Sequence, residues 1–138
     1  MLKKTFVDTF YIVALINERD EYHTKANELV EFYDKQPLLV TDAVLLEIGN
    51  SLARNYKSQV IEIFEEFFAS KEVEIVRLDE TLFNKAFQLY KTHADKSWGL
   101  VDCISFVVMR EYDITDALTC DKHFAQAGFR ALRLDSVN

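Results

Sequence analysis

Short apolar runs alternate with longer stretches of helical periodicity along the whole chain. The short runs predict strands at Thr5 to Val7, Leu38 to Val40, Val73 to Val76, Ala117 to Thr119 and Arg130 to Leu134. The longer stretches predict helices at Thr9 to Ile16, Glu21 to Tyr33, Thr41 or Asp42 to about Tyr56, Ser58 to Ala69, Asp79 to about Thr92, Ser97 to about Tyr112 and Asp121 to Gly128. This alternation is typical of βαβ units and predicts an α/β fold with a short, mostly parallel β-sheet flanked by helices.

The chain is interpreted as one domain over residues 1–138. It contains no linker, repeat or low-complexity segment, and Pro37 lies in a polar break inside the domain. In parallel sheets of this kind, ligands bind outside the carboxyl ends of the strands. Functional residues are therefore expected where strands end and helices begin.

The predicted helix over residues 58–69 is amphipathic and rich in phenylalanine. The apolar side chains expected to face inward are Val60, Ile61, Phe64, Phe67 and Phe68. This face either joins the core or forms a dimer interface, and we expect mainly a core role with some contribution to a dimer.

Composition narrows the class of protein. Apolar residues make up 49% of the 138 residues, enough to bury a core, which excludes intrinsic disorder. Three glycines and one proline exclude collagen-like chains and turn-rich all-β designs. Cys103 and Cys120 are expected to be reduced and to pack as small apolar side chains.

The net charge and the N-terminal segment limit the binding partners and the cellular location that are expected for this chain. The net charge of −7 excludes nucleic acid binding by bulk electrostatics, so RNA or DNA would need a local positive feature such as a metal cluster. A basic protein partner is the other use of an acidic surface. The apolar run from Phe10 to Ile16 is too short to span a membrane, and charged residues interrupt any signal-peptide pattern. We therefore expect a cytoplasmic protein without a membrane anchor.

Two aspartates directly follow predicted strands. Asp8 follows Val7, and Asp121 closely follows Thr119, and each precedes a predicted helix. Taken singly, each carboxylate is most simply a helix N-cap. In a parallel sheet, however, both turns lie at the same edge, so the two carboxylates converge if their strands are neighbours.

Two further acids lie in predicted helices. Asp102 lies in an almost wholly apolar helix, where an ionised carboxylate needs a cap role, a partner or a metal. Glu47 shares a polar stripe with Asn50 and Arg54, which faces either bulk solvent or a cleft.

Convergence of these carboxylates would require a cation, because like charges in one cleft repel one another. Oxygen ligands suit Mg²⁺ or Mn²⁺, which can activate water and stabilise charge on a transferring phosphate. No histidine or cysteine spacing indicates a metal site. His23, His93 and His123 are scattered, and His123 is interpreted as a structural residue or a local hydrogen-bonding group.

The order of these motifs resembles a PIN domain over essentially the whole chain. The motifs are Phe6-Val7-Asp8-Thr9, Val44-Leu45-Leu46-Glu47 with Asn50, Leu100-Val101-Asp102 with Ser105, and Leu118-Thr119-Cys120-Asp121-Lys122-His123-Phe124. The resemblance implies a three-layer α/β/α fold and endonuclease action on RNA. It also implies an acidic pocket for Mg²⁺ or Mn²⁺, made by Asp8, Glu47, Asp102 and Asp121, with Thr9, Thr119, Ser105 and Asn50 in supporting positions.

The same resemblance suggests roles and partners. Asp8, Asp102 and Asp121 would ligate metal directly or through water, and Glu47 would ligate it or position the attacking water. The chain is similar to VapC-type toxins, which implies a small antitoxin, and dimerisation is common in PIN-like proteins. Candidates for contacts with the RNA backbone are Arg54, Lys57, Lys96 and Lys122, although solvated charges are the simpler interpretation. Trp98, Phe10 and Tyr11 either stack on bases or pack in the core, which we favour.

Other protein classes with acids at strand ends fit less well. A phosphoreceiver domain needs a second acid beside the one that ends its first strand, and residues 3–7 supply none. A dehalogenase-type phosphatase needs Asp-x-Asp there, where this chain has Phe10. The alternative that stays open is a PIN-like binding module that sequesters RNA or a protein partner and whose acids are catalytically silent.

Overall fold

Within residues 3–33 and 35–132, which the computed structural model describes, the chain forms a five-stranded sheet with all neighbouring strands parallel. The strands are β1 (Thr5–Val7), β2 (Leu38–Thr41), β3 (Val73–Val76), β4 (Asp116–Leu118) and β5 (Arg130–Leu132). Their order is β3-β2-β1-β4-β5, so the strand order reverses beside β1. The turns after β1 and β4 therefore lie next to each other, at the kind of position where α/β sheets bind ligands.

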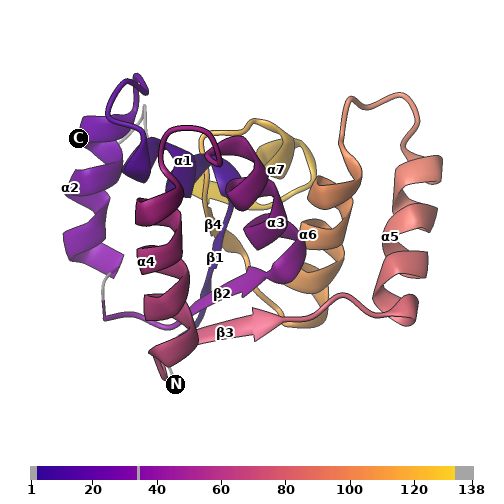
Figure 1. The fold of residues 1–138 in the computed structure, drawn as a ribbon. Helices are drawn as coiled ribbons and strands as arrows, with labels where there is room; N and C mark the ends of the chain where they lie inside the picture. The colour runs from indigo at the N-terminus through magenta and orange to yellow at the C-terminus, as the bar shows by residue number, and fades with distance from the viewer. Residues whose placement is uncertain (1–2, 34, 133–138) are drawn as a thin grey trace.

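Helices connect the strands and cover the sheet, which confirms the predicted fold class. They are α1 (Thr9–Ile16), α2 (His23–Tyr33), α3 (Asp42–Ser51), α4 (Lys57–Ala69), α5 (Glu80–Thr92), α6 (Leu100–Glu111) and α7 (His123–Gln126). Figure 1 shows α2 and α4 on one side of the sheet and α5 with α6 on the other. Among the described residues, every helix is too short or too polar to cross a membrane.

An aromatic cluster under the centre of the sheet fixes α6 and α7. The ring of Phe124 lies 6.0 Å from that of Phe6 in β1 and 5.0 Å from that of Phe106 in α6, measured between centroids. Trp98 packs edge-on against Phe106 at 5.0 Å. These rings are buried, so they hold the start of α6 and the turn before α7 close to the end of β1.

Several element boundaries differ from the sequence prediction. The helix that starts at Asp42 ends at Ser51 and not near Tyr56, because the exposed residues 53–55 form a turn before α4. Helix α6 begins at Leu100, so Ser97 is not its cap; the carboxylate of Asp102 instead accepts the backbone N–H of Gly99. Strand β4 ends at Leu118, and the predicted end of the last strand, Leu134, lies outside the described residues.

The prediction for the inward face of α4 was partly wrong. Val60 is buried and Phe64 and Phe67 are half-buried, but Ile61 and Phe68 are 51% and 56% exposed. A helix on a surface buries only one stripe, and Val60, Phe64 and Phe67 occupy it at i, i+4 and i+7. Ile61 and Phe68 therefore lie outside the core.

The aromatic and cysteine predictions have mixed outcomes. Trp98 and Tyr11 are buried, as favoured, whereas Phe10 is 49% exposed, so its assignment to the core was wrong. Phe10 follows Thr9 in the first turn of α1, and the buried face of that helix carries Tyr11 and Ile12. Cys103 and Cys120 are free thiols, buried and half-buried respectively.

Thr41 caps α3 and provides a test of the local fold. Its Oγ1 accepts the backbone N–H of Val44 at 3.1 Å, and the side chain is fully buried. We expect Thr41→Ala to lower the free energy of unfolding by about 1 kcal/mol, because this N–H loses its acceptor. Chemical denaturation measures the change, and Thr41→Ser, which keeps the hydroxyl, is the matched control. An equal loss in both variants would assign the effect to the methyl group.

Candidate active site

Asp8 lies buried at the carboxyl end of β1. Its side chain is only 2% exposed, and its Oδ2 accepts a hydrogen bond from the Thr119 hydroxyl at 2.7 Å. Although Asp8 precedes α1, its side chain makes no capping hydrogen bond to that helix. The simple interpretation of Asp8 as a capping carboxylate is therefore wrong.

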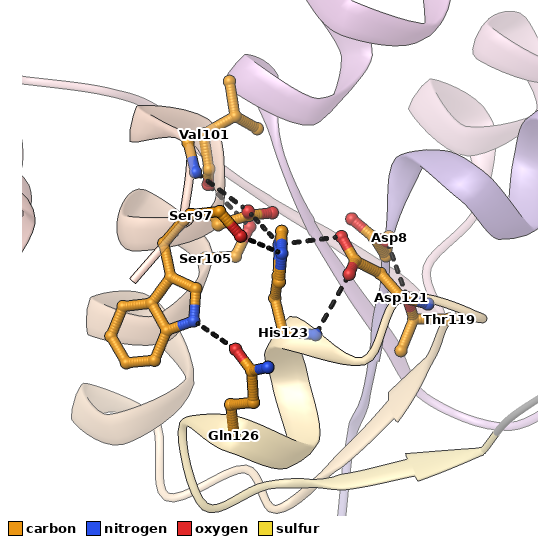
Figure 2. Close-up of polar contacts among 11 residues, drawn as sticks. Asp8, Ser97, Val101, Ser105, Thr119, Asp121, His123 and Gln126 are labelled. Atoms are coloured by element: carbon orange, nitrogen blue, oxygen red, sulfur yellow. Dashed lines mark hydrogen bonds and ion pairs between the residues drawn. The ribbon is translucent and has the colours of Figure 1, made fainter. Parts of the chain in front are cut away.

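The turn after β4 is ordered by a chain of hydrogen bonds. The Thr119 hydroxyl, which donates to Asp8, also accepts the backbone N–H of Asp121 at 2.9 Å. The Oδ1 of Asp121 in turn accepts the backbone N–H of His123 at 3.0 Å. Thr119 thus ties the ends of β1 and β4 together and brings Asp121 towards Asp8 (Figure 2).

Asp102 reaches the same place from the first turn of α6. Its Oδ2 accepts the N–H of Gly99 at 3.1 Å, so the carboxylate does cap the helix, but it also lies 2.9 Å from Nδ1 of His123. Ser105, one turn further along, donates its hydroxyl to the carbonyl of Val101 and, within the described residues, is not hydrogen-bonded to the acids. Its observed role is within the helix.

His123 lies between two of the acids and was not predicted as a site residue. Its Nδ1 is 2.9 Å from Oδ2 of Asp102 and 3.3 Å from Oδ2 of Asp121, and its Nε2 is 3.2 Å from the hydroxyl of Ser97. Figure 2 shows the ring pointing from the start of α7 towards Asp121 and Ser97. The sequence signal was the spacing Asp121-x-His123, followed by the buried anchor Phe124.

Burial and mutual repulsion perturb the acids. Burial raises the pKa of Asp8 from 3.8 to about 7; the Thr119 hydrogen bond opposes this rise, and the charges of Asp102 and Asp121 add to it. Burial also raises the pKa of Asp102, against the effect of its hydrogen bonds from Gly99 and His123. The raised pKa values of Asp8 and Asp102 therefore indicate that neighbouring groups of the protein do not fully compensate the negative charge of these carboxylates.

A divalent cation fits the donor set. Ligand atoms of Asp102, Asp121 and His123 lie within 4.8 Å of one another, and the three side chains are 12–17% exposed. The buried Thr9 hydroxyl, next to Asp8 in the chain, has no hydrogen-bond partner among the residues described. A hydrated cation would lower the repulsion at Asp8 and could satisfy such a hydroxyl through a bound water.

Glu47 is not joined to this cluster by hydrogen bonds or ion pairs in the described part of the chain. It is half-buried on α3, and its backbone carbonyl accepts the Ser51 hydroxyl at 2.8 Å. Asn50, on the same helix, is exposed. The candidate RNA-contacting side chains are all exposed: Arg54, Lys57, Lys96 and Lys122.

The side chain of Trp98 is buried among other side chains, so its ring is not exposed for stacking on an RNA base. Its indole N–H donates to Oε1 of Gln126 at 3.0 Å, and its ring stacks with His93 at 4.9 Å between centroids. This hydrogen bond joins the loop before α6 to α7. Trp98 therefore supports the two elements that carry Asp102 and His123.

Comparison with known proteins gives consistent matches over nearly the whole chain. The family model for the PIN domain matches residues 5–130. The 23S rRNA-specific endonuclease VapC20 of Mycobacterium tuberculosis is 30% identical over 129 residues, which cover 93% of this chain and 97% of that protein. Its crystal structure, described as that of a sarcin-ricin loop cleaving toxin, matches with a TM-score of 0.83 and 28% identity, over 94% of this chain and 99% of the other.

A more distant solved structure shares the fold alone. The crystal structure of FitAcB from Neisseria gonorrhoeae matches with a TM-score of 0.65 at 13% identity. The match covers 96% of this chain and 99% of the other. The arrangement of sheet and helices is thus retained where little sequence is shared.

Proposed function

The chain belongs to the PIN domain family, and we propose that it is a metal-dependent endoribonuclease that hydrolyses phosphodiester bonds in RNA. The observation that carries the proposal is the convergence of Asp8, Asp102 and Asp121 from three separate elements at the ends of β1 and β4. The raised pKa of buried Asp8 indicates a group of carboxylates that a cation would stabilise.

We assign the binding of Mg²⁺ or Mn²⁺ to these three aspartates, directly or through water. When bound, such an ion supplies positive charge to the transferring phosphate and activates water. Thr119 holds Asp8 and the backbone of Asp121 in position, and the buried hydroxyl of Thr9, unpartnered within the described residues, is proposed as a further polar group of the pocket. Glu47 is proposed to position the attacking water or to join the metal ligands from α3 when RNA and metal are bound, with Asn50 beside it on the same helix.

Four exposed cationic side chains are proposed to contact the RNA backbone. Lys122 directly follows Asp121, and Lys96 lies in the loop that carries Ser97. Arg54 lies in the turn between α3 and α4, and Lys57 is the first residue of α4. Together with bound metal, they would supply the local positive charge that a chain with a net charge of −7 needs in order to hold a phosphate backbone.

We propose 23S ribosomal RNA as the substrate, because a relative with 30% identity over nearly its full length is specific for it. The test is incubation of the purified chain with a hairpin of the sarcin-ricin loop sequence in Mn²⁺, in Mg²⁺ and in EDTA. We expect cleavage at one position with metal and none in EDTA. A hairpin of equal length and scrambled loop sequence is the matched control.

The assay also separates the proposal from its alternative. Cleavage of both hairpins would support an endoribonuclease of broader specificity and contradict the ribosomal assignment. Binding of the hairpin without cleavage, in the presence of metal that raises the melting temperature, would favour a catalytically silent binding module. No cleavage together with no effect of metal on the melting temperature would contradict the metal-dependent enzyme.

The remaining proposals concern the setting of the enzyme. We propose that residues 1–138 form one domain acting in the cytoplasm as the toxin of a toxin–antitoxin pair. A small antitoxin with a basic segment would complement the net charge of −7. A homodimer is also proposed, because Ile61 and Phe68 on the helix α4 are apolar and exposed.

A further inference from the structure

The ring of His123 is fixed in one orientation with a nitrogen facing the acids. Its Nδ1 is within 3.3 Å of one oxygen each from Asp102 and Asp121, which belong to different elements. Its side chain is 17% exposed, so bulk water does not fully surround it. The backbone N–H of His123 is bonded to Asp121, and the next residue, Phe124, is fully buried, so the ring has a rigid base.

The spacing of these atoms suits a metal shell as well as a hydrogen bond. In the octahedral shell of Mg²⁺, whose bonds are about 2.0–2.1 Å long, adjacent ligands lie roughly 2.9 Å apart. The observed separations from Nδ1 are 2.9 Å to Asp102 and 3.3 Å to Asp121. A cation could therefore replace the proton between Nδ1 and the carboxylates with little movement of the ring.

The other ring nitrogen has the partner that a metal-bound histidine needs. A ligating imidazole normally donates its second N–H to a nearby acceptor, which fixes its tautomer and orientation. The Nε2 of His123 lies 3.2 Å from the hydroxyl of Ser97, which can accept this hydrogen bond. With Nε2 protonated, Nδ1 carries the free lone pair and lies next to the carboxylates of Asp102 and Asp121.

We propose that His123 is a nitrogen ligand of the metal ion, joining Asp102 and Asp121, and that it makes the site prefer Mn²⁺ to Mg²⁺. Imidazole binds transition metals well, whereas Mg²⁺ favours oxygen ligands and water. The inference rests on the proposed function, since it assumes that a cation occupies the acidic cluster. It adds a ligand from outside the four acids and assigns the selectivity of the site to one side chain.

The direct test is pulsed electron paramagnetic resonance of the full chain loaded with one equivalent of Mn²⁺, without RNA. We expect modulation from a directly bound ¹⁴N nucleus, which changes to the ¹⁵N pattern in protein grown with ¹⁵N-histidine. This readout needs no variant and no activity. Bound Mn²⁺ without histidine nitrogen coupling would overturn the role of His123 and leave the proposed nuclease intact.

Variants then identify the histidine and the selectivity. We expect His123→Asn to abolish the nitrogen coupling and to weaken Mn²⁺ binding on the order of 10-fold or more, with a smaller effect on Mg²⁺. His23→Asn is the matched control, because His23 bonds the carbonyl of Ala14 away from the acids. Coupling that persists in His123→Asn, or equal losses for both metals, would overturn the inference. Mn²⁺ that does not bind the wild type at all would overturn both this inference and the proposed metal-dependent function.

Discussion

Asp102→Asn is expected to reduce RNA cleavage in Mn²⁺ on the order of 10³-fold. Removal of this carboxylate weakens the hold on a cation whose charge stabilises the transferring phosphate by several kcal/mol, and each 1.36 kcal/mol is a factor of ten in rate. The substitution keeps the shape of the side chain, and the amide oxygen can still accept the N–H of Gly99 that Asp102 accepts now. Single-turnover cleavage of the ribosomal hairpin measures the effect.

A second helix-capping aspartate provides the control for Asp102. Asp79 caps α5 by accepting the N–H of Leu82 at 2.8 Å, and it is exposed. Asparagine caps helices as well as aspartate does, so Asp79→Asn should cleave at the wild-type rate. Wild-type cleavage by a folded Asp102→Asn variant would show that this carboxylate is only a cap.

The strand-end aspartates were predictable because the signal is local. A short apolar strand followed by an acid and a helix places Asp8 and Asp121 at the edge of any parallel sheet. What the sequence did not show is that the Thr119 hydroxyl, 111 residues from Asp8, takes the carboxylate away from a capping role. Long-range pairing of this kind depends on the strand order and cannot be read from spacing alone.

The wrong predictions for the helices also arise from contacts between residues that are distant in the sequence. Periodicity shows that α4 has an apolar stripe, but Ile61 and Phe68 extend that stripe beyond the width that one packing surface can bury. Ser97 is a good cap by residue type, yet Trp98 is buried against Phe106 and the carboxylate of Asp102 takes the N–H of Gly99. Tertiary contacts therefore decided where these elements begin and which side chains they bury.

His123 was not predicted as a site residue, because its contact with Asp102 joins positions far apart in the sequence and its contact with Asp121 depends on a third residue. Its contact with Asp102 spans 21 positions, and its contact with Asp121 requires the turn that Thr119 orders. Glu47 is the opposite case, because its motif predicted it as a site residue. Its motif resembles the family pattern, but the described structure leaves its side chain without a hydrogen bond to the other acids.

Asp8→Asn is expected to stabilise the metal-free protein, with an effect that grows as the pH rises. In the folded chain, burial raises the pKa of Asp8 to about 7, whereas the unfolded chain has the ordinary value near 3.8. Below pH 3.8 both states are protonated, and the carboxyl group causes no penalty. Between pH 3.8 and about 7 the folded state binds more protons than the unfolded state, so stability is lost as the pH rises.

Above pH 7 the folded state holds the carboxylate of Asp8 buried and charged, so the full loss of folding free energy caused by its raised pKa applies. A shift of this size corresponds to up to about 4 kcal/mol, which the neutral amide of asparagine would remove. The measurement is chemical denaturation of wild type and Asp8→Asn in EDTA at pH 5 and pH 8. We expect a clear gain in the stability of the variant over the wild type at pH 8 and a much smaller gain at pH 5.

Bound Mn²⁺ is expected to reverse the order of stability of the wild type and Asp8→Asn. Mn²⁺ binds only the folded state of the wild type and raises its stability with concentration, whereas Asp8→Asn has lost one carboxylate and gains less. At saturating Mn²⁺ and pH 8 the wild type is therefore expected to be the more stable of the two. An Asp8→Asn variant that is less stable than wild type in EDTA at both pH values would mean that the Thr119 hydrogen bond outweighs the buried charge, and that Asp8 serves the fold rather than a cation.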